Sequence, residues 1–123
     1  MTISGGKIEG ATGIYVKSGE VNITGGEIVA NGTFNEPTPN GNGFNQTGGA
    51  IVLDSKAGYA GNMKLKVSGN AKITSVNGYA VQETLTDKDT SATLDISISA
   101  GEFKAATGKP AVTVSSAFLQ AAQ

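Results

Sequence analysis

The sequence predicts an all-β protein, specifically a right-handed parallel β-helix (a β-solenoid) of about four coils with three short strands per coil. Three observations support this fold class. A short motif recurs along the chain, aliphatic and polar residues alternate within each copy, and the 123 residues include 18 Gly but no Cys or Trp. Alternation with period two is typical of half-buried strands, and frequent Gly favours tight turns over helices.

The first repeated motif predicts two strands joined by a small turn. Its copies are ISGGKI (3–8), ITGGEI (23–28), VSGNAKI (67–73) and ISAGEF (98–103). Because Gly5-Gly6 and Gly25-Gly26 carry no Cβ, they can adopt positive φ and let the chain turn sharply. Each copy therefore predicts a strand A before the turn and a strand B after it.

The second repeated motif predicts a third strand, C, in each coil. Its copies are GIYV (13–16), AIVL (50–53), AVQE (80–83) and AVTV (111–114). One coil alone has too few apolar residues to fold, whereas stacked coils bury a continuous core. Each coil advances the chain by one strand spacing, about 4.8 Å, so equivalent strands of neighbouring coils pair in parallel.

The alternation of apolar and polar residues predicts which side chains point into the core. Equivalent inward residues of successive coils form a column, and each of the strands A, B and C contributes such residues. Strand A contributes Ile3, Val21, Ile23, Leu65, Val67, Ile96 and Ile98; strand B contributes Ile8, Ile28, Ile73 and Phe103; strand C contributes Ile14, Val16, Ile51, Leu53, Val81, Val112 and Val114. Glu83 falls at an inward position of strand C. Either strand C of that coil ends early or Glu83 is an unusual buried acid, and we favour the early end because burying a carboxylate is costly.

The residues just before the strand B column alternate in charge: Lys7, Glu27, Lys72 and Glu102. Coils stacked in register would place each of them about 4.8 Å from the next. Opposite charges on adjacent strands attract one another. The sequence therefore predicts a charge ladder on the surface, with a structural role.

Composition excludes several classes of function. The formal net charge is −1 and there is no Arg, so no basic excess is available to neutralise nucleic-acid phosphates. No apolar run approaches the roughly 18 residues of a membrane span, and no signal peptide is visible. By size, 1–123 is a single domain, which we interpret as a fragment of a longer chain. We interpret 115–123 as a short helical cap on the last coil.

The repeats also resemble a known group. The run at 3–26, ISGG-x-I followed by G-I-x-V-x-S-G-x-V-x-I-T-G-G, resembles repeats of right-handed parallel β-helix proteins of the pectate-lyase-like superfamily. It is similar, more narrowly, to repeats in large secreted or surface-anchored bacterial proteins, some of them carbohydrate-binding. The resemblance implies an extracellular or cell-surface location and a polysaccharide partner.

Candidate catalytic and metal sites are few. Enzymes of the resembled superfamily use Asp clusters for calcium with a basic residue, often Arg, or paired acids, whereas this chain has no Arg, His or Cys. Asp54, Asp87 and Asp89 fall at one corner of neighbouring coils. Calcium takes at least six oxygen ligands, so these three acids are weak candidates, and a solvated loop is the simpler interpretation. We therefore predict no cofactor, no catalytic residue and no enzyme activity.

Insertions indicate where a ligand would bind. Residues 30–49 form a long loop between strands B and C of the second coil, and 54–64 and 84–94 lengthen the corner after strand C. These loops would wall a groove whose floor is the outward face of strand C. The predicted binding residues are Tyr15, Lys17, Val52, Asp54 and Gln82, with Phe34, Phe44 and Tyr59 from the walls, and Thr113 continues the outward row.

A ring beside polar groups suits a sugar, which has an apolar face and a rim of hydroxyls. In the alternative interpretation, the long loop folds down and its Phe side chains cover Val52. Three functions stay open on these grounds: a non-catalytic, polysaccharide-binding segment of a bacterial cell-surface or secreted protein; a purely structural stalk or adhesin spacer; and, least favoured, a polysaccharide lyase or hydrolase. The ligand's identity and the oligomeric state stay open as well.

Overall fold

The structure is a computed structural model that describes residues 1–16, 19–34, 38–40, 43–45, 47–53, 63–83 and 94–113. All regular elements within these residues are strands, which confirms the predicted all-β class for this part of the chain. Their bounds are β1 (Thr2–Ile3), β2 (Lys7–Gly10), β3 (Ile14–Val16), β4 (Gly19–Ile23), β5 (Glu27–Ala30), β6 (Thr38–Asn40), β7 (Gly43–Asn45), β8 (Ile51–Leu53), β9 (Met63–Val67), β10 (Lys72–Ser75), β11 (Val81–Glu83), β12 (Leu94–Ile98), β13 (Glu102–Lys104) and β14 (Val112–Thr113). A search of the same residues finds no helix suited to crossing a membrane.

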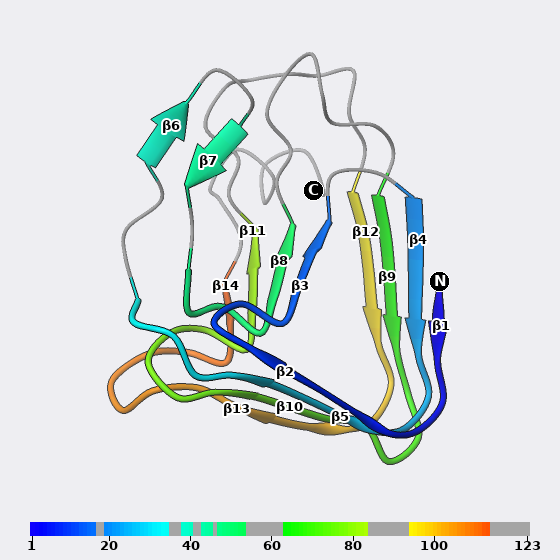
Figure 1. The fold of residues 1–123 in the computed structure, drawn as a ribbon. Coiled ribbons are helices and arrows are strands. Elements are labelled where there is room, and N and C mark those ends of the chain that lie inside the picture. The colour runs from blue at the N-terminus through cyan, green and yellow to red at the C-terminus, as the bar shows by residue number, and fades with distance from the viewer. Residues whose placement is uncertain are drawn as a thin grey trace.

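Three parallel sheets of four strands each make up the fold. Sheet A has the order β1-β4-β9-β12, sheet B the order β2-β5-β10-β13 and sheet C the order β3-β8-β11-β14. The chain visits A, B and C in that sequence four times, and we call each visit a repeat unit. Figure 1 shows the three sheets on three sides of a common interior. This arrangement is consistent with the predicted parallel β-solenoid.

The strand register follows the sequence repeats. In sheet B the motif residues lie opposite one another as Ile8, Ile28, Ile73 and Phe103. In sheet A the aligned residues are Ile3, Ile23, Val67 and Ile98, and in sheet C they are Ile14, Ile51, Val81 and Val112. Each predicted column is thus one ladder of paired residues, which is why a short motif repeated at irregular spacing still gives a regular stack.

The core lies where the two inner repeat units contribute their columns. The side chains at most 1% exposed include Ile23, Ile28, Ile51, Leu53, Leu65, Val67, Ile73 and Val81. Each contributes roughly 1.5–3 kcal/mol when fully buried. The same columns are open in the fourth unit, where Ile98 is 40% exposed and Val112 is 36% exposed. Val114 lies outside the described residues.

Glu83 contradicts the predicted early end of strand C. β11 includes Glu83, which pairs with Leu53 of β8 and is only 5% exposed. The prediction rested on the cost of burying the side chain alone. Strand pairing is made by backbone groups, and the adjacent β8 supplies partners for them whatever side chain the residue carries.

The long insertion contains strands that the sequence pattern does not predict. Within 30–49, expected to be loop throughout, β6 and β7 form an antiparallel pair in which Pro39 lies opposite Phe44. The predicted loop 54–64 is also too long, because β9 already begins at Met63, which is 2% exposed and belongs to the core. The remaining predicted loop residues 54–62 and 84–93, and the predicted cap 115–123, lie outside the described residues.

The small turns use their glycines in two ways. Gly6 and Gly26, the second glycine of each pair, have φ of 79° and 83°. Gly25 does not have positive φ, but a Cβ there would lie 2.5 Å from the carbonyl oxygen of Ser4 in the preceding unit. The first residue of the second turn is therefore small because two turns approach closely, and the second is Gly because of its backbone angle.

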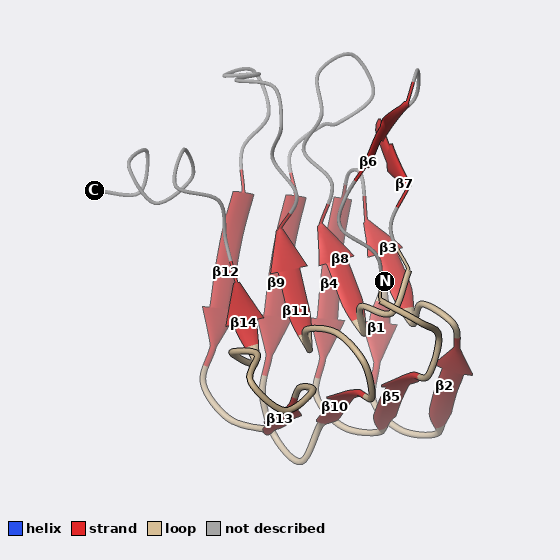
Figure 2. Cartoon of the chain, turned by 90° about the vertical axis from the view of Figure 1, so that its left-hand side faces the viewer, coloured by secondary structure: helices blue, strands red, loops and turns tan. Residues whose placement is uncertain are grey.

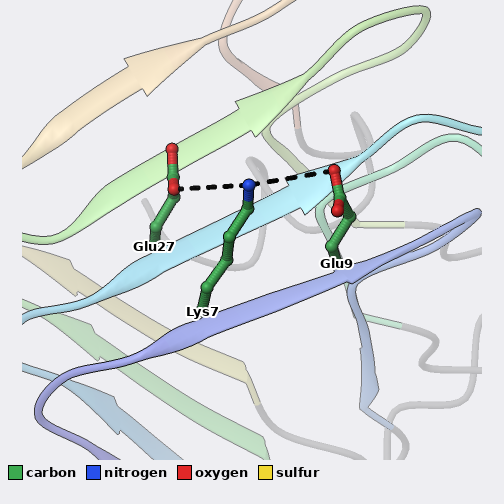
Figure 3. Close-up of polar contacts among 3 residues, drawn as sticks. All are labelled: Lys7, Glu9 and Glu27. Carbon is green, nitrogen blue, oxygen red and sulfur yellow. Dashed lines mark ion pairs between the residues drawn. The ribbon is translucent and has the colours of Figure 1, made fainter.

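The predicted charge ladder is present on sheet B. Lys7 is paired in register with Glu27, Glu27 with Lys72, and Lys72 with Glu102. Lys7 Nζ lies 3.8 Å from Glu27 Oε1 and 4.0 Å from Glu9 Oε2, so that its ammonium group sits between two carboxylates (Figure 3). All of these side chains are substantially exposed, so each ion pair contributes little on its own.

Candidate functional site

The residues of the predicted outward row of sheet C lie opposite one another on adjacent strands. Tyr15 lies opposite Val52, Val52 opposite Gln82, and Gln82 opposite Thr113. Exposure differs sharply along this row, since Tyr15 is 38% exposed whereas Val52 is 0% and Gln82 is 5% exposed. The two central residues of the predicted floor are therefore covered, and of these three side chains only Tyr15 reaches the surface.

The end of the long insertion runs close against this row. A Cβ on Gly49 would lie 2.6 Å from Val52 Cγ2 and 3.7 Å from Gln82 Oε1. Glycine is therefore needed at this position for the chain to pass so close to Val52. The hairpin of β6 and β7 stands outside sheet C, near the ends of β3 and β8 (Figures 1 and 2). The alternative interpretation, that Phe side chains of the insertion cover Val52, stays a prediction, because the described contacts of Phe34 are with Gly78 and Tyr79.

Gln82 carries an unsatisfied polar atom. Its Oε1 is buried and has no hydrogen-bond partner among the described residues. A buried acceptor without a partner costs about 1–3 kcal/mol relative to one that is satisfied.

An aromatic pair with a lysine lies at the corner that precedes strand C. The rings of Phe34 and Tyr79 have centroids 5.6 Å apart at an interplanar angle of 79°, an edge-to-face contact. Lys109 Nζ lies 4.3 Å from the Phe34 centroid and 5.3 Å from that of Tyr79. All three side chains are partly exposed. They come from the second, third and fourth repeat units, so the cluster spans three layers of the stack.

Small residues beneath the cluster hold it in place. A Cβ on Gly78 would lie 2.9 Å from Phe34 Cδ1, so the Phe34 ring rests directly on the Gly78 backbone. Ser75 fixes this corner, because its hydroxyl donates to the Gly48 carbonyl and accepts from the Gly78 N–H at 2.8 Å. Asn77 Nδ2 donates to the Gly32 carbonyl at 2.8 Å. The corners of the second and third units are thus tied together below the rings.

Sequence reasoning named Phe34 but missed Tyr79 and Lys109. Both precede strand C of their units, Tyr79 by two residues and Lys109 by three, counting back from Val81 and Val112. Counting back from each strand C would have placed them at the corner where the long insertion leaves the stack. The predicted site instead drew only on residues of the strand and of the insertions.

The other predicted site residues are not brought together by the described structure. Phe44 lies in β7, while Lys17, Asp54, Tyr59, Asp87 and Asp89 lie outside the described residues. Among the residues that are described, no group of three or more acidic, His or Cys side chains could hold a metal ion.

Comparison with known proteins finds no matching family model, no similar curated protein and no similar solved structure. The superfamily resemblance of the repeats therefore stays an expectation from the sequence. The proposal for the function rests instead on the geometry of the cluster of Phe34, Tyr79 and Lys109.

Proposed function

We propose that this chain is a non-catalytic segment of a bacterial cell-surface or secreted protein and binds polysaccharide beside sheet C. We further propose that the three parallel sheets are the faces of a right-handed β-helix, and that the long insertion flanks the binding face. The cell-surface location follows from the resemblance of the repeats alone.

The observation that carries this proposal is the cluster of Phe34, Tyr79 and Lys109. Partly exposed rings offer apolar surface to the C–H face of a sugar, and the ammonium group of Lys109 can donate to hydroxyls or to a sugar carboxylate. Among the described residues no salt bridge engages Lys109, whose ammonium group lies against the Phe34 and Tyr79 rings.

A purely structural role is the second candidate, and the burial of Val52 and Gln82 favours it. In that case Phe34 and Tyr79 serve to anchor the insertion, and Lys109 stabilises the pair through a cation–π contact worth roughly 0.5–1 kcal/mol. The chain would then be a stalk or spacer without a ligand site of its own.

Affinity electrophoresis separates the candidates. The protein is run through gels containing polygalacturonate as an acidic polysaccharide or dextran as a neutral one, next to a gel without polysaccharide. Retardation in either gel that is lost in Lys109→Ala but kept in Lys104→Ala supports binding at the cluster. Unchanged migration in both gels overturns the binding proposal and leaves the structural role. Release of shorter sugars from either polymer would instead indicate a lyase or hydrolase.

A further inference from the structure

Asn-Gly is a dipeptide that can deamidate without an enzyme, and this chain contains it at 31–32, 40–41, 42–43 and 77–78. Two of these copies, Asn31-Gly32 and Asn77-Gly78, lie wholly within the described residues, at the corners that follow β5 and β10. The same dipeptide thus occurs at equivalent corners of the second and third repeat units. Differences in reactivity between the two copies must therefore come from their surroundings.

Deamidation joins the backbone nitrogen of the glycine to the side chain of the preceding asparagine. The nitrogen gives its proton to a solvent base and attacks the asparagine Cγ. The new C–N bond replaces the bond to the side-chain nitrogen, which leaves as ammonia. Water then opens the cyclic succinimide at one of its two carbonyl groups and gives aspartate or isoaspartate. Glycine favours the attack because no Cβ shields its nitrogen.

Two kinds of hydrogen bond oppose this reaction. A bond donated by the glycine N–H holds the proton that must leave, and a bond made by the asparagine side chain keeps Cγ from turning towards the nitrogen. Because each bond must break before the attack, each one slows the reaction by roughly 2- to 10-fold. Burial of the glycine opposes it further, since the solvent base and the water must reach the reacting atoms.

Both kinds of bond are present at Asn77-Gly78. The Gly78 N–H donates to Ser75 Oγ at 2.8 Å, and Asn77 Nδ2 donates to the Gly32 carbonyl at 2.8 Å. Gly78 is buried, and Ser75 is 2% exposed and donates in turn to the Gly48 carbonyl. The nucleophile and the side chain that it would attack are therefore each held by a neighbouring group.

Asn31-Gly32 is held less firmly. Asn31 is exposed, and its side chain makes no hydrogen bond within the described part of the chain. The Gly32 N–H donates to the Ala11 carbonyl at 3.2 Å, which is longer than the bond made by Gly78, and Gly32 is only partly buried. The asparagine side chain can therefore turn towards the nitrogen, and only the longer bond to Ala11 restrains the departing proton.

We propose that Asn31 is a site of spontaneous deamidation in the folded chain, and that Ser75 and the Gly32 carbonyl protect Asn77 from the same reaction. Isoaspartate at position 31 would add a carbon atom to the backbone between β5 and Phe34, and so would alter the corner that carries the cluster of Phe34, Tyr79 and Lys109. The proposal does not depend on polysaccharide binding, because it uses only the hydrogen bonds and the exposure of the two corners.

The test follows both dipeptides in the same parent chain. Folded protein is incubated in mildly alkaline buffer and sampled over time, and tandem mass spectrometry of its peptides quantifies aspartate plus isoaspartate at positions 31 and 77. We expect Asn31 to convert at least roughly 2- to 10-fold faster than Asn77. In a parallel incubation in urea, which removes the hydrogen bonds of both corners, the two positions should convert at similar rates.

A variant tests the protecting group. Ser75→Ala removes the acceptor of the Gly78 N–H, and Thr74→Ala, at the preceding position of β10, is the matched control. Ser75→Ala should speed conversion at Asn77 by roughly 2- to 10-fold and leave Asn31 unchanged, with folding verified by circular dichroism. If this variant does not fold, the rates in the folded parent decide. Equal rates at the two positions of the folded parent, no conversion there at Asn31, or an Asn77 rate that folded Ser75→Ala leaves unchanged would overturn the proposal.

Discussion

Lys72 Nζ lies 3.9 Å from Glu102 Oε2, and this ion pair links the third repeat unit to the fourth. It is one step of a ladder in which Glu27 has a lysine in register on each side, Lys7 and Lys72. Within the described sheet Glu102 has such a neighbour on one side only. The effect of a charge change should therefore depend on its place in the ladder.

Glu27→Lys should destabilise the fold by about 1 kcal/mol, because it places three lysines side by side on adjacent strands. Glu102→Lys is the matched control: it creates a single like-charge contact, with Lys72, and should cost about half as much. Urea unfolding at low salt measures both changes, and added salt should shrink the difference between them. Equal effects of the two variants would contradict an energetic role for the ladder.

Ile23→Asp should cost several kcal/mol, because Ile23 is 1% exposed and its carboxylate replacement would be buried between neighbouring units. Asn22→Asp, at the adjacent and partly exposed position of the same strand, removes the hydrogen bond to Glu20 but buries no charge, so it should lower the melting temperature far less. Thermal unfolding followed by circular dichroism compares the two. A melting temperature for Ile23→Asp no lower than that for Asn22→Asp would show that the Ile23 column does not point inward.

Gly25→Ala should destabilise by about 1–3 kcal/mol. The added Cβ would lie 2.5 Å from the Ser4 carbonyl oxygen, and both partners are constrained by the parallel pairing of their units. Gly5→Ala is the equivalent change in the first unit, where nothing lies within 4 Å of the added atom and φ is not positive. It should be neutral or slightly stabilising. Chemical unfolding of both variants tests whether close approach of the turns, rather than flexibility, requires Gly25.

The pKa of Glu20 should be lower than its ordinary value of 4.5, chiefly because Asn22 Nδ2 donates to Glu20 Oε1 at 2.7 Å, and also because Lys64 and Lys66 are nearby. A lowered pKa in the folded state stabilises the fold above the pKa of the unfolded chain. That contribution disappears as the pH falls through the lower, folded pKa. NMR titration of the Glu20 carboxyl in the parent and in Asn22→Ala measures the effect. The pKa should rise towards its ordinary value in the variant, and an unchanged pKa would show that the hydrogen bond is not its main cause.

Period-two alternation places the strands of the three parallel sheets, because inward-facing columns let neighbouring units bury their aliphatic residues against one another. The repeated motif, aligned on its small turn, sets the register, which is why Lys7, Glu27 and Lys72 can be assigned to one ladder from the sequence. Glu83 shows the limit of this reasoning, since a polar side chain at an inward position does not stop the backbone from pairing with β8.

The corners and the insertion could not be predicted in the same way. Tyr79 and Lys109 meet Phe34 through the path of three separate corners, and no residue period predicts such a path. Similarly, the burial of Val52 depends on where the chain around Gly49 passes, which the alternation within strand C does not specify. The candidate site thus lies mainly where the sequence is not periodic.

Tyr15→Ala and Tyr79→Ala together should distinguish a binding face from a covered one. Tyr15 is 38% exposed in an edge strand, so its removal should change the melting temperature little while lowering any affinity for polysaccharide. Tyr79 contacts both Phe34 and Lys109, so its removal should lower stability as well, by about 1–3 kcal/mol. Affinity electrophoresis and thermal unfolding of both variants give the two readouts. If Tyr15→Ala lowers stability as much as Tyr79→Ala, and the parent chain binds no polysaccharide, sheet C presents no binding face and the aromatic residues serve the stack alone.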